Sequence, residues 1–241
     1  MAAAGPATGV LEGRVAIVTG GTGGLGRQVT RLFLDAGADV TVTYRDPGER
    51  DALAALLPAH LRERLHAAAA DVTQAPSVGD LVASVTARAG RLDVLVNVVG
   101  GFAPGDLLAT DEAAWDRMLI LNLKTAYLCC RAALPALIAA GGGRIVNVGS
   151  RSVVPPTGGF IAYTVSKSAV LALTAALAHE ARPHRVTVNA VLPSTMDTEA
   201  NRRAMPGADV SKWVKPESVA QAILFLASPA AADVTGTLVM V

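Results

Sequence analysis

Two side chains that could move a proton stand close together in the stretch YTVSK: Tyr163 and Lys167, four residues apart. On a helix, residues with this spacing share a face, so the phenol and the amine would point the same way. A free tyrosine has a pKa of about 10, too high for efficient proton transfer at neutral pH. A positive charge about 4 Å away, at an effective dielectric of about 20, would lower that pKa to about 7. The pair therefore predicts a proton-transferring tyrosine; the alternative is a polar pair on an ordinary amphipathic helix.

Ser150 and Asn122 are two further polar candidates. Ser150 ends the apolar stretch RIVNVGS, which is typical of a strand, thirteen residues before Tyr163. At the carboxyl edge of a parallel sheet, where such sheets bind ligands, its hydroxyl could hold a substrate carbonyl for hydride attack. Asn122 lies between leucines in LILNLKTAY, within a predicted helix. It is either a core amide with its hydrogen bonds made or a link in a proton relay.

The glycine-rich stretch TGGTGGLG follows an apolar strand pattern and opens a helix pattern. In that position glycines let the backbone approach a pyrophosphate, and the free N–H groups and dipole of the helix attract its negative charge. The spacing of Gly20, Gly24 and Gly26 is wider than in the common GxGxxG motif. Glycine runs also make plain turns, but the strand–turn–helix context favours a dinucleotide site.

The second strand pattern, DVTVTY, ends at Tyr44 and is followed by Arg45. A ribose with a free 2′-hydroxyl is held by a carboxylate about twenty residues after the glycines, whereas a 2′-phosphate requires arginine. The lack of a carboxylate at this strand end therefore favours NADP(H) over NAD(H). The alternative is that Arg45 is a surface residue and that Asp46 binds the ribose. Asp71, after the third strand pattern, could bond an adenine edge or cap a helix, since DVTQ resembles a capping box.

Short apolar stretches alternate with longer helical patterns along the whole chain. Strands are expected near 14–19, 39–44, 65–70, 92–99, 144–150, 185–193 and 237–241, and helices near 24–36, 48–57, 75–89, 111–140, 161–181 and 216–227. This alternation predicts one α/β domain with a Rossmann-type, doubly wound parallel sheet of about seven strands. We expect a flexible tail at 1–12 and a nucleotide-binding domain at 13–241 that includes a substrate loop at 194–215.

The composition argues against several classes of protein. The net charge is +1 and no Lys/Arg block occurs, so nucleic acid is not an expected partner. No apolar run approaches the roughly 18 residues of a membrane span, and the N-terminus lacks the basic start of a secretory signal. We therefore expect a cytoplasmic protein that does not bind a membrane. The two cysteines are adjacent and the four histidines are scattered, so neither a disulfide nor a metal site is expected.

The chain from Gly13 to Val241 resembles the short-chain dehydrogenase/reductase family. The resemblance rests on motifs that occur in order and in register: Thr19-Gly20-x-x-x-Gly24-x-Gly26, Asp71, Asn97 to Gly100, Asn122, Ser150, Tyr163-x-x-x-Lys167, and Pro193 to Thr198. It implies that Tyr163 is the catalytic acid/base and that Lys167 lowers its pKa and binds the nicotinamide ribose. It also implies that Ser150 orients the carbonyl and that Asn122 supports a water-linked proton path.

The same resemblance assigns a larger group of residues to the cofactor. They are Thr19, Gly20, Thr22, Gly24, Leu25, Gly26, Tyr44, Arg45, Asp71, Val72, Asn97, Gly100, Tyr163, Lys167, Pro193, Thr195 and Thr198. Three positions depart from the family's pattern. The usual NNAG is NVVG at 97–100, the usual PG after the sixth strand is Pro193-Ser194, and Gly23 stands where many NADP-using relatives carry a basic residue. The NADP prediction therefore depends on Arg45.

The segment 194–215 resembles the short substrate lid of dihydropteridine reductase-like members of the family, and GGF at 100–102 fits that relation. Against it, those members resemble NAD enzymes with an acidic residue after the second strand, and they lack the serine kept here as Ser150. Several apolar side chains could line a substrate pocket or simply pack the lid. They are Phe102, Phe160, Met196, Met205 and Trp213.

Three functions follow from these residues. The first, favoured by Ser150 and Arg45, is an NADPH-dependent oxidoreductase that transfers a hydride between nicotinamide and a carbonyl or alcohol substrate of the ketone or 3-oxoacyl type. The second is a dihydropteridine reductase-like NAD(P)H enzyme. The third is a non-catalytic cofactor-binding sensor, against which the intact Ser150, Tyr163 and Lys167 argue. The apolar helices at 111–140 and 161–181 resemble those with which the family pairs its subunits, which implies a homodimer or homotetramer.

Overall fold

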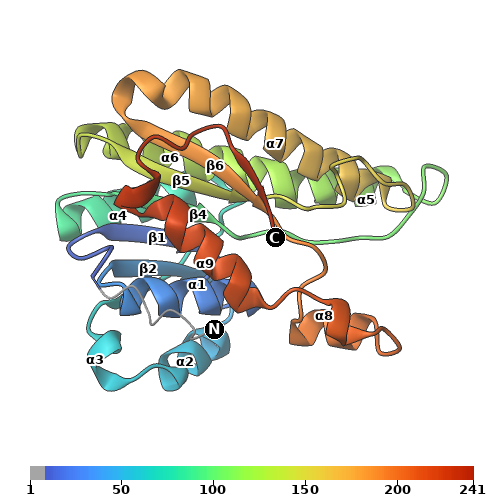
Figure 1. Cartoon of the computed structure of the whole chain (residues 1–241), viewed down its shortest axis with the longest axis horizontal. Helices are drawn as coiled ribbons and strands as arrows, with labels where there is room; N and C mark the ends of the chain where they lie inside the picture. The colour runs from blue at the N-terminus through green and yellow to red at the C-terminus, as the bar shows by residue number, and fades with distance from the viewer. Residues whose placement is uncertain (1–8) are drawn as a thin grey trace.

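The computed structural model describes residues 9–241 and contains one sheet of seven parallel strands (Figure 1). The strands lie in the order β3-β2-β1-β4-β5-β6-β7, so the direction of travel across the sheet reverses between β1 and β4. They are β1 (Val15–Thr19), β2 (Asp39–Tyr44), β3 (Leu65–Ala69), β4 (Val94–Asn97), β5 (Gly143–Val148), β6 (Val186–Leu192) and β7 (Leu238–Met240). The predicted Rossmann-type, doubly wound sheet of seven strands is confirmed.

Helices cover both faces of the sheet, which explains why most strands read as continuous apolar runs. They are α1 (Gly24–Asp35), α2 (Pro47–Leu56), α3 (Ala59–Arg62), α4 (Ala75–Ala89), α5 (Glu112–Met118), α6 (Thr125–Ala139), α7 (Ile161–Ala181), α8 (Glu199–Ala204) and α9 (Pro216–Ala227). α1 and α9 pack together over one buried core, and α4, α6 and α7 cover the other. Since each connecting helix runs back against the strands, helices begin at the carboxyl edge of the sheet and end at its amino edge.

Three segments differ from the elements expected from sequence. The helix expected over 111–140 is interrupted by a π-helical segment, Leu119–Lys124, between α5 and α6. The loop expected after β6 contains the short helix α8 and a 3-10 turn, Val210–Lys212. The helix α3 was not expected at all. These elements are one or two turns long, and contacts distant in sequence fix them more than local propensity does.

The N-terminal boundary of the domain lies earlier than expected. Of the predicted tail at 1–12, residues 1–8 lie outside the described part of the chain. Residues 9–12 are packed against the domain: Leu11 is fully buried, and its N–H donates to the carbonyl oxygen of Ala36 at 2.9 Å. The domain therefore begins before Gly13.

One helical stretch, Ile161–His184, is long and apolar enough to cross a membrane by length and composition alone. It is not an uninterrupted apolar run, because Lys167 and several hydroxyl side chains interrupt it. The stretch consists of α7 and the turn after it, and α7 packs along β6 and the π-helical segment. Its buried face carries Ser166, Lys167 and Thr174, whose polar groups are hydrogen-bonded inside the fold. These contacts make it a core helix of the domain.

Candidate active site

The glycine-rich turn joins β1 to α1 at the carboxyl edge of the sheet. Gly20 has a left-handed φ of +64°, and its N–H donates to Thr43 Oγ1 at 2.9 Å. A Cβ on Gly26 would collide with the carbonyl oxygen of Gly20, so only glycine lets the turn lie this close to the helix. No side chain caps α1, and no acidic residue lies in its first turn. The N–H groups of that turn are thus open to an anion, which suits the pyrophosphate of a dinucleotide.

Two predicted cofactor residues, Thr19 and Thr22, hold this turn in place. Thr19 Oγ1 accepts hydrogen bonds from the N–H groups of Val98 at 3.1 Å and Val99 at 3.4 Å, which ties β1 to the segment after β4. Thr22 is buried, and its hydroxyl donates to Glu49 Oε2 at 2.8 Å. Glu49 cannot be found from the sequence, because no motif marks a carboxylate in the first turn of α2.

Asn97 points into the protein interior. Its Nδ2 donates to Asn147 Oδ1 on β5 at 2.8 Å, and Asn147 Nδ2 donates to Thr174 Oγ1 on α7 at 2.9 Å. The Val98 and Val99 side chains, which replace the family's usual residues, pack against opposite core clusters. The structure therefore gives Asn97 a positioning role at the end of β4, with its amide turned to β5.

The end of β2 gathers positive charge around an aromatic ring. The Arg50 guanidinium lies over the half-buried Tyr44 ring, 5.5 Å from its centroid, and pairs with Asp51 at 2.7 Å. Arg45 follows Tyr44 and is exposed. Arg50 is thus a second arginine near the end of β2, and it was missed because it stands in a helix outside any motif.

Asp71 caps a turn and does not cap a helix. Its Oδ1 accepts from the N–H of Thr73 at 3.0 Å and from Thr73 Oγ1 at 2.7 Å. These hydrogen bonds and, more weakly, the charge of Arg45 hold the pKa of Asp71 below its ordinary value. α4 begins at Ala75 without a side-chain cap, so the capping-box alternative is wrong. Val72, beside it, is buried, and the predicted adenine contact of both residues remains a prediction.

Asn122 lies in the π-helical segment and is buried, with both ends of its amide engaged. Its Oδ1 accepts from the Gly101 N–H at 2.8 Å, and its Nδ2 donates to the Gly101 carbonyl at 3.1 Å and to Ser166 Oγ at 2.9 Å. A Cβ on Gly100 would lie 2.8 Å from Asn122 Oδ1 and 3.1 Å from Lys167 Nζ. Of the two alternatives for Asn122, the structure shows a core amide with its hydrogen bonds made; the proton relay remains a prediction.

Ser150, Tyr163 and Lys167 meet between the end of β5 and the first turns of α7. Lys167 is 5% exposed, and its Nζ donates to the carbonyl oxygen of Val148 at 2.8 Å. Ser150 is nearly buried, and its Oγ lies 2.9 Å from Ser152 Oγ. Its hydroxyl is close enough to Tyr163 to act on the pKa of the phenol. The three side chains predicted from spacing are therefore neighbours at the carboxyl edge, and Ser152 joins them.

The prediction that Lys167 lowers the pKa of Tyr163 is wrong for this arrangement. Burial raises the pKa of the Tyr163 phenol above its ordinary value, and the hydrogen bond with Ser150 opposes that rise only in part. Burial also lowers the pKa of the Lys167 ammonium to about 8. The physical reason is that both groups are desolvated and that the lysine donates to Val148 at the end of β5.

An aromatic cluster covers Tyr163. Phe102 lies 5.0 Å from Tyr163 between ring centroids, in an edge-on arrangement, and 5.6 Å from Phe160. Phe160 lies 6.0 Å from Tyr163, again edge-on. The exposed fraction of Phe102 is 60%, so one face of this apolar group is open to solvent. Two of the five predicted pocket residues thus contact the tyrosine.

The other three predicted pocket residues belong to the lid at 194–215. Met196 pairs with Val214 and packs against the core, Met205 follows the end of α8, and Trp213 follows the 3-10 turn. Within the described part of the chain, none of the three makes an aromatic contact or an ion pair with Tyr163. Their predicted role at the substrate remains a prediction.

The segment after β6 approaches the glycine turn. The methyl group of Thr198 lies 2.9 Å from where a Cβ on Gly24 would stand. Pro193 is buried at the end of β6, and the carbonyl oxygen of Thr195 accepts from the Val214 N–H at 2.9 Å. The predicted cofactor residue Leu25 is buried in the core below the turn. Thr198 therefore packs against the glycine turn, and its predicted contact with the cofactor remains a prediction.

The cysteines take no part in this site. Cys129 and Cys130 are buried in α6 as free thiols, and burial raises the pKa of each to about 12. At such a pKa the reactive thiolate is scarce at neutral pH. Over residues 9–241, no group of three or more His, Cys, Asp or Glu side chains could hold a metal ion.

An open helix N-terminus after β1 and a buried Ser–Tyr–Lys group after β5 lie at one edge of a doubly wound sheet, where such folds bind dinucleotides. The residues present fit a nicotinamide dinucleotide, because the glycine turn leaves its amides free and Gly100 leaves room beside Lys167. Fold and site together define a dinucleotide-dependent oxidoreductase.

Comparison with known proteins agrees with this class. The sequence matches the family described as short chain dehydrogenase over residues 14–208. It is 32% identical over 232 residues to an NAD-dependent glycerol dehydrogenase of Listeria innocua, covering 92% of this chain and 90% of that protein. It is 32% identical over 237 residues to a 3-oxoacyl-acyl-carrier-protein reductase of Thermotoga maritima, covering 95% and 96%.

A solved short-chain dehydrogenase/reductase from Burkholderia xenovorans superimposes with a TM-score of 0.86 at 35% identity, covering 97% of this chain and 96% of that one. The chain therefore belongs to the short-chain dehydrogenase/reductase family. It is an NAD(P)-dependent oxidoreductase that transfers a hydride between nicotinamide and a ketone or alcohol substrate.

Proposed function

We propose that this protein is an NADPH-dependent carbonyl reductase that acts on a ketone or 3-oxoacyl substrate, with Tyr163 as the acid/base. The observation that carries the proposal is the convergence of Ser150, Tyr163 and Lys167 at the edge of the sheet that holds the open N-terminus of α1. A sensor without catalysis would need only the nucleotide-binding half of this arrangement.

Each side chain has a role that follows from its surroundings. When bound, the nicotinamide supplies the hydride. Ser150 Oγ donates to the carbonyl oxygen of the substrate, and Tyr163 then donates its phenolic proton to the same oxygen. The raised pKa of Tyr163 keeps the phenol protonated at neutral pH, which suits a proton donor in the direction of reduction. Lys167 Nζ, beside the gap at Gly100, donates to the ribose hydroxyls, and Asn122 holds Gly101 in place.

The preference for NADPH depends on the charges at the end of β2. Arg45 is exposed there, and Arg50 lies over the Tyr44 ring. Guanidinium groups bind a phosphate dianion in bidentate geometry, which supports a 2′-phosphate at this position. The Glu49 carboxylate, which accepts a hydrogen bond from Thr22, opposes the preference for NADPH because it would repel a 2′-phosphate. The related glycerol dehydrogenase of Listeria innocua is NAD-dependent.

The aromatic cluster supports a substrate with an apolar flank. Phe102 and Phe160 present apolar surface beside Tyr163 and offer no hydrogen bonds to a row of hydroxyl groups. Relatives act on polyols, such as glycerol, or carry the name of a 3-oxoacyl reductase. The rings favour the acyl chain of the second kind of substrate over the hydroxyls of the first.

A homo-oligomer and a cytoplasmic location complete the proposal. A largely apolar hollow of about 370 Å³ lies on the outer face of the π-helical segment and α6, lined by Leu119, Ile120, Leu123, Lys124 and Tyr127. Ile120 and Tyr127 are 41% and 45% exposed. Contact with a second copy of the chain would remove this apolar surface from water, which is favourable. We expect sedimentation of the purified protein to show a dimer or a tetramer.

The test starts with titration of the purified protein with NADPH and NADH, followed by nucleotide fluorescence. We expect NADPH to bind at least about tenfold more tightly, as one charge-assisted contact predicts. Arg45→Ala should abolish this preference, and Glu49→Gln should increase it, because it removes an opposing charge and keeps the hydrogen-bonding shape. A preference for NADH in the unmodified protein would contradict the NADPH assignment.

A substrate screen with the preferred cofactor then tests the chemistry. It should include 3-oxoacyl thioesters, alkyl and aryl ketones, polyols and quinonoid dihydropteridine. We expect turnover of an apolar ketone or 3-oxoacyl thioester above that of any polyol. Turnover of the pteridine alone would establish the dihydropteridine reductase-like alternative in its place.

A further inference from the structure

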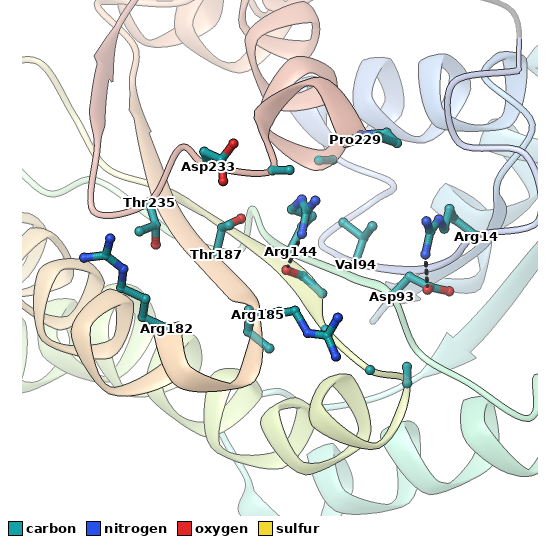
Figure 2. A pocket seen from close by; sticks show the side chains of 17 residues that line it. Arg14, Asp93, Val94, Arg144, Arg182, Arg185, Thr187, Pro229, Asp233 and Thr235 are labelled. Atoms are coloured by element: carbon teal, nitrogen blue, oxygen red, sulfur yellow. Dashed lines mark hydrogen bonds and ion pairs between the residues drawn. The ribbon is translucent and has the colours of Figure 1, made fainter.

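A second cavity opens at the amino edge of the sheet, at the far end of the strands from Tyr163. This amino-edge cavity has a volume of about 530 Å³ and is lined by the residues that precede or begin β1, β4, β5, β6 and β7 (Figure 2). Its size is in the range of about 300–1,000 Å³ that is typical of small-molecule sites. The proposed reductase activity uses none of its residues.

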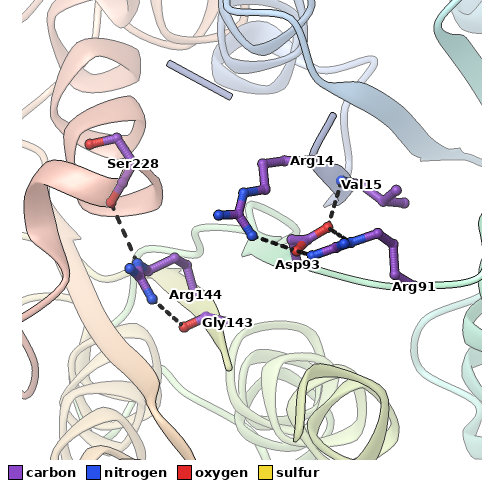
Figure 3. A network of polar contacts seen from close by, with 7 residues as sticks. All are labelled: Arg14, Val15, Arg91, Asp93, Gly143, Arg144 and Ser228. Carbon is purple, nitrogen blue, oxygen red and sulfur yellow. Dashed lines mark hydrogen bonds and ion pairs between the residues drawn. The ribbon is translucent and has the colours of Figure 1, made fainter. Parts of the chain in front are cut away.

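Positive charge predominates among the lining side chains. Four arginines line the amino-edge cavity, Arg14, Arg144, Arg182 and Arg185, against two carboxylates, Asp93 and Asp233. Asp93 is already engaged, since it accepts from Arg14, from Arg91 outside the cavity and from the Val15 N–H (Figure 3). Only Asp233, which is exposed, remains to balance the other three arginines.

One of these arginines, Arg144, is hydrogen-bonded to backbone carbonyl groups at this edge, including one at the end of a helix. The helices α6, α7 and α9 end at this edge, and their last carbonyl groups carry partial negative charge. Arg144 meets part of that charge: it donates to the carbonyl oxygens of Gly143 at 3.0 Å and Ser228 at 3.5 Å (Figure 3). The guanidinium groups of Arg182 and Arg185 make no hydrogen bond or ion pair anywhere in residues 9–241. Their donors are free for a ligand.

Thr187 adds a second, independent observation. It is 5% exposed, and its Oγ1 has no hydrogen-bond partner within the described chain. Thr187 and Arg144 are register partners on β6 and β5, so their side chains lie on the same face of the sheet, and both line the cavity (Figure 2). A buried hydroxyl without a partner destabilises a fold, and a ligand oxygen in the cavity would complete its hydrogen bonding.

The geometry points to a binding site for a phosphorylated small molecule in the amino-edge cavity, held by the free guanidinium groups of Arg182 and Arg185, by Arg144, and by the Thr187 hydroxyl. Arginine forks match the paired oxygens of a phosphate, and a hydroxyl can donate to a third oxygen. This site is separate from the nucleotide site at the carboxyl edge and does not depend on the proposed function.

Calorimetric titration of the purified protein with sodium pyrophosphate tests the proposal. We expect saturable binding, with a dissociation constant between about 10 µM and about 1 mM, that weakens as salt is added. The double variant Arg182→Gln/Arg185→Asn should bind at least about tenfold more weakly. Asparagine is chosen at 185 because this residue has a left-handed φ of +56°, which asparagine tolerates. Arg31→Gln, at an exposed position of α1 that does not line the cavity, is the control and should bind as the unmodified protein does.

Thr187→Val separates a ligand contact from a structural effect. Valine has nearly the same shape, so it should raise the thermal midpoint of the free protein by removing an unpaired buried hydroxyl. It should nevertheless weaken pyrophosphate binding by about threefold or more, since one hydrogen bond to the ligand is lost. A merely structural threonine would change the midpoint and leave the affinity as it was.

Three results would overturn the proposal. One is no heat of binding up to about 10 mM pyrophosphate, which is weaker than any useful site of this kind. Another is equal affinity in the double variant and the Arg31→Gln control, which would place the anion elsewhere, including at the carboxyl edge. The third is citrate binding as tightly as pyrophosphate, which would make the cavity a carboxylate site and not a phosphate site.

Discussion

The helices α1 and α7 begin at the carboxyl edge of the sheet, whereas α6, α7 and α9 end at its amino edge. The first edge therefore presents unpaired N–H groups, and the second presents unpaired carbonyl groups. At the carboxyl edge, the glycine turn leaves the backbone N–H groups of α1 without a side-chain cap, and the buried cation Lys167 donates to a carbonyl. At the amino edge, the donors belong to side chains, mainly arginines, together with the Thr187 hydroxyl.

This difference shows how one parallel sheet can hold two polar regions of different construction. A backbone site tolerates few charged side chains, because desolvation shifts their pKa values, as it does for Tyr163 and Lys167. A side-chain site keeps its charges exposed or paired, as with Arg14 and Asp93. Substitutions at the carboxyl edge should therefore change the rate of the reaction, and substitutions at the amino edge should change the stability of the fold.

The largest effect is expected for Tyr163→Phe. Loss of the phenolic proton donor should lower kcat by about 10³-fold, within the range measured for general acids. The affinity for NADPH should change little, because the ring and its contacts with Phe102 and Phe160 are kept. Steady-state kinetics and nucleotide fluorescence measure the two quantities separately. Retained turnover would show that another group supplies the proton.

Asp93→Asn is the corresponding test of the amino edge. The carboxylate is 3% exposed and accepts from Arg14, Arg91 and the Val15 N–H. Asparagine keeps the shape but removes the charge, so the free energy of unfolding should fall by about 3 kcal/mol. Denaturant unfolding measures the loss, and catalysis by the folded fraction should be unaffected. A loss of catalysis without a loss of stability would contradict the division between the edges.

The same carboxylate should give acid sensitivity. Burial raises the pKa of Asp93, but hydrogen bonds from Arg91, Val15 and Arg14 outweigh it and hold the pKa below the ordinary 3.8. A carboxyl with a depressed pKa stabilises the fold at pH values above 3.8, and this contribution is lost as the pH falls through the lower, folded value. The stability difference between the unmodified protein and Asp93→Asn should therefore shrink in acid.

Sequence predicted the sheet because its strands are apolar runs separated by glycine and by amphipathic patterns, and these signals are local. The π-helical segment could not be predicted, since it depends on Asn122 reaching Gly101 and Ser166, which are distant along the chain. The spacing of Tyr163 and Lys167 correctly placed both on one helix. It could not show that the lysine donates to Val148 or that burial dominates both pKa values.

The amino-edge cavity shows the same limit more clearly. Its arginines occur at positions 14, 144, 182 and 185, and no motif connects them. Only the parallel sheet, by bringing the starts of its strands to one edge, makes them neighbours. Glu49 and Arg50 at the nucleotide end were missed for a similar reason, since their contacts with Thr22 and Tyr44 cross between α2 and the strand ends.

Lys167 should impose an alkaline limit on the carboxyl edge. Burial lowers its pKa to about 8, so its ammonium form is lost as the pH rises through that value. The value of kcat/KM for reduction should therefore fall about tenfold for each pH unit above the limit. In Lys167→Arg the charge persists to much higher pH, so the falling limb should move to alkaline pH whatever the absolute rate. Lys124→Arg, which makes the same change at an exposed position, should keep the original profile.

A falling limb that stays at pH 8 in Lys167→Arg would assign the titration to another group. Tyr163 is the nearest candidate, but its pKa is raised by burial, so its own titration should lie well above the lysine's. The separation of the two limbs thus reports directly on desolvation at this edge.

The smallest effect is expected for Ser152→Ala. Ser152 Oγ lies 2.9 Å from Ser150 Oγ, and Ser150 is the group proposed to hold the substrate carbonyl. Loss of one neutral hydrogen bond, about 1 kcal/mol, should lower kcat about fivefold and leave KM nearly unchanged, because the bond orients Ser150 and does not itself bind substrate. Ser218→Ala, on the exposed side of α9, is the matched control. An equal change in kcat in both variants would mean that the Ser152 hydroxyl does not position Ser150, so its hydrogen bond would have no part in the reaction.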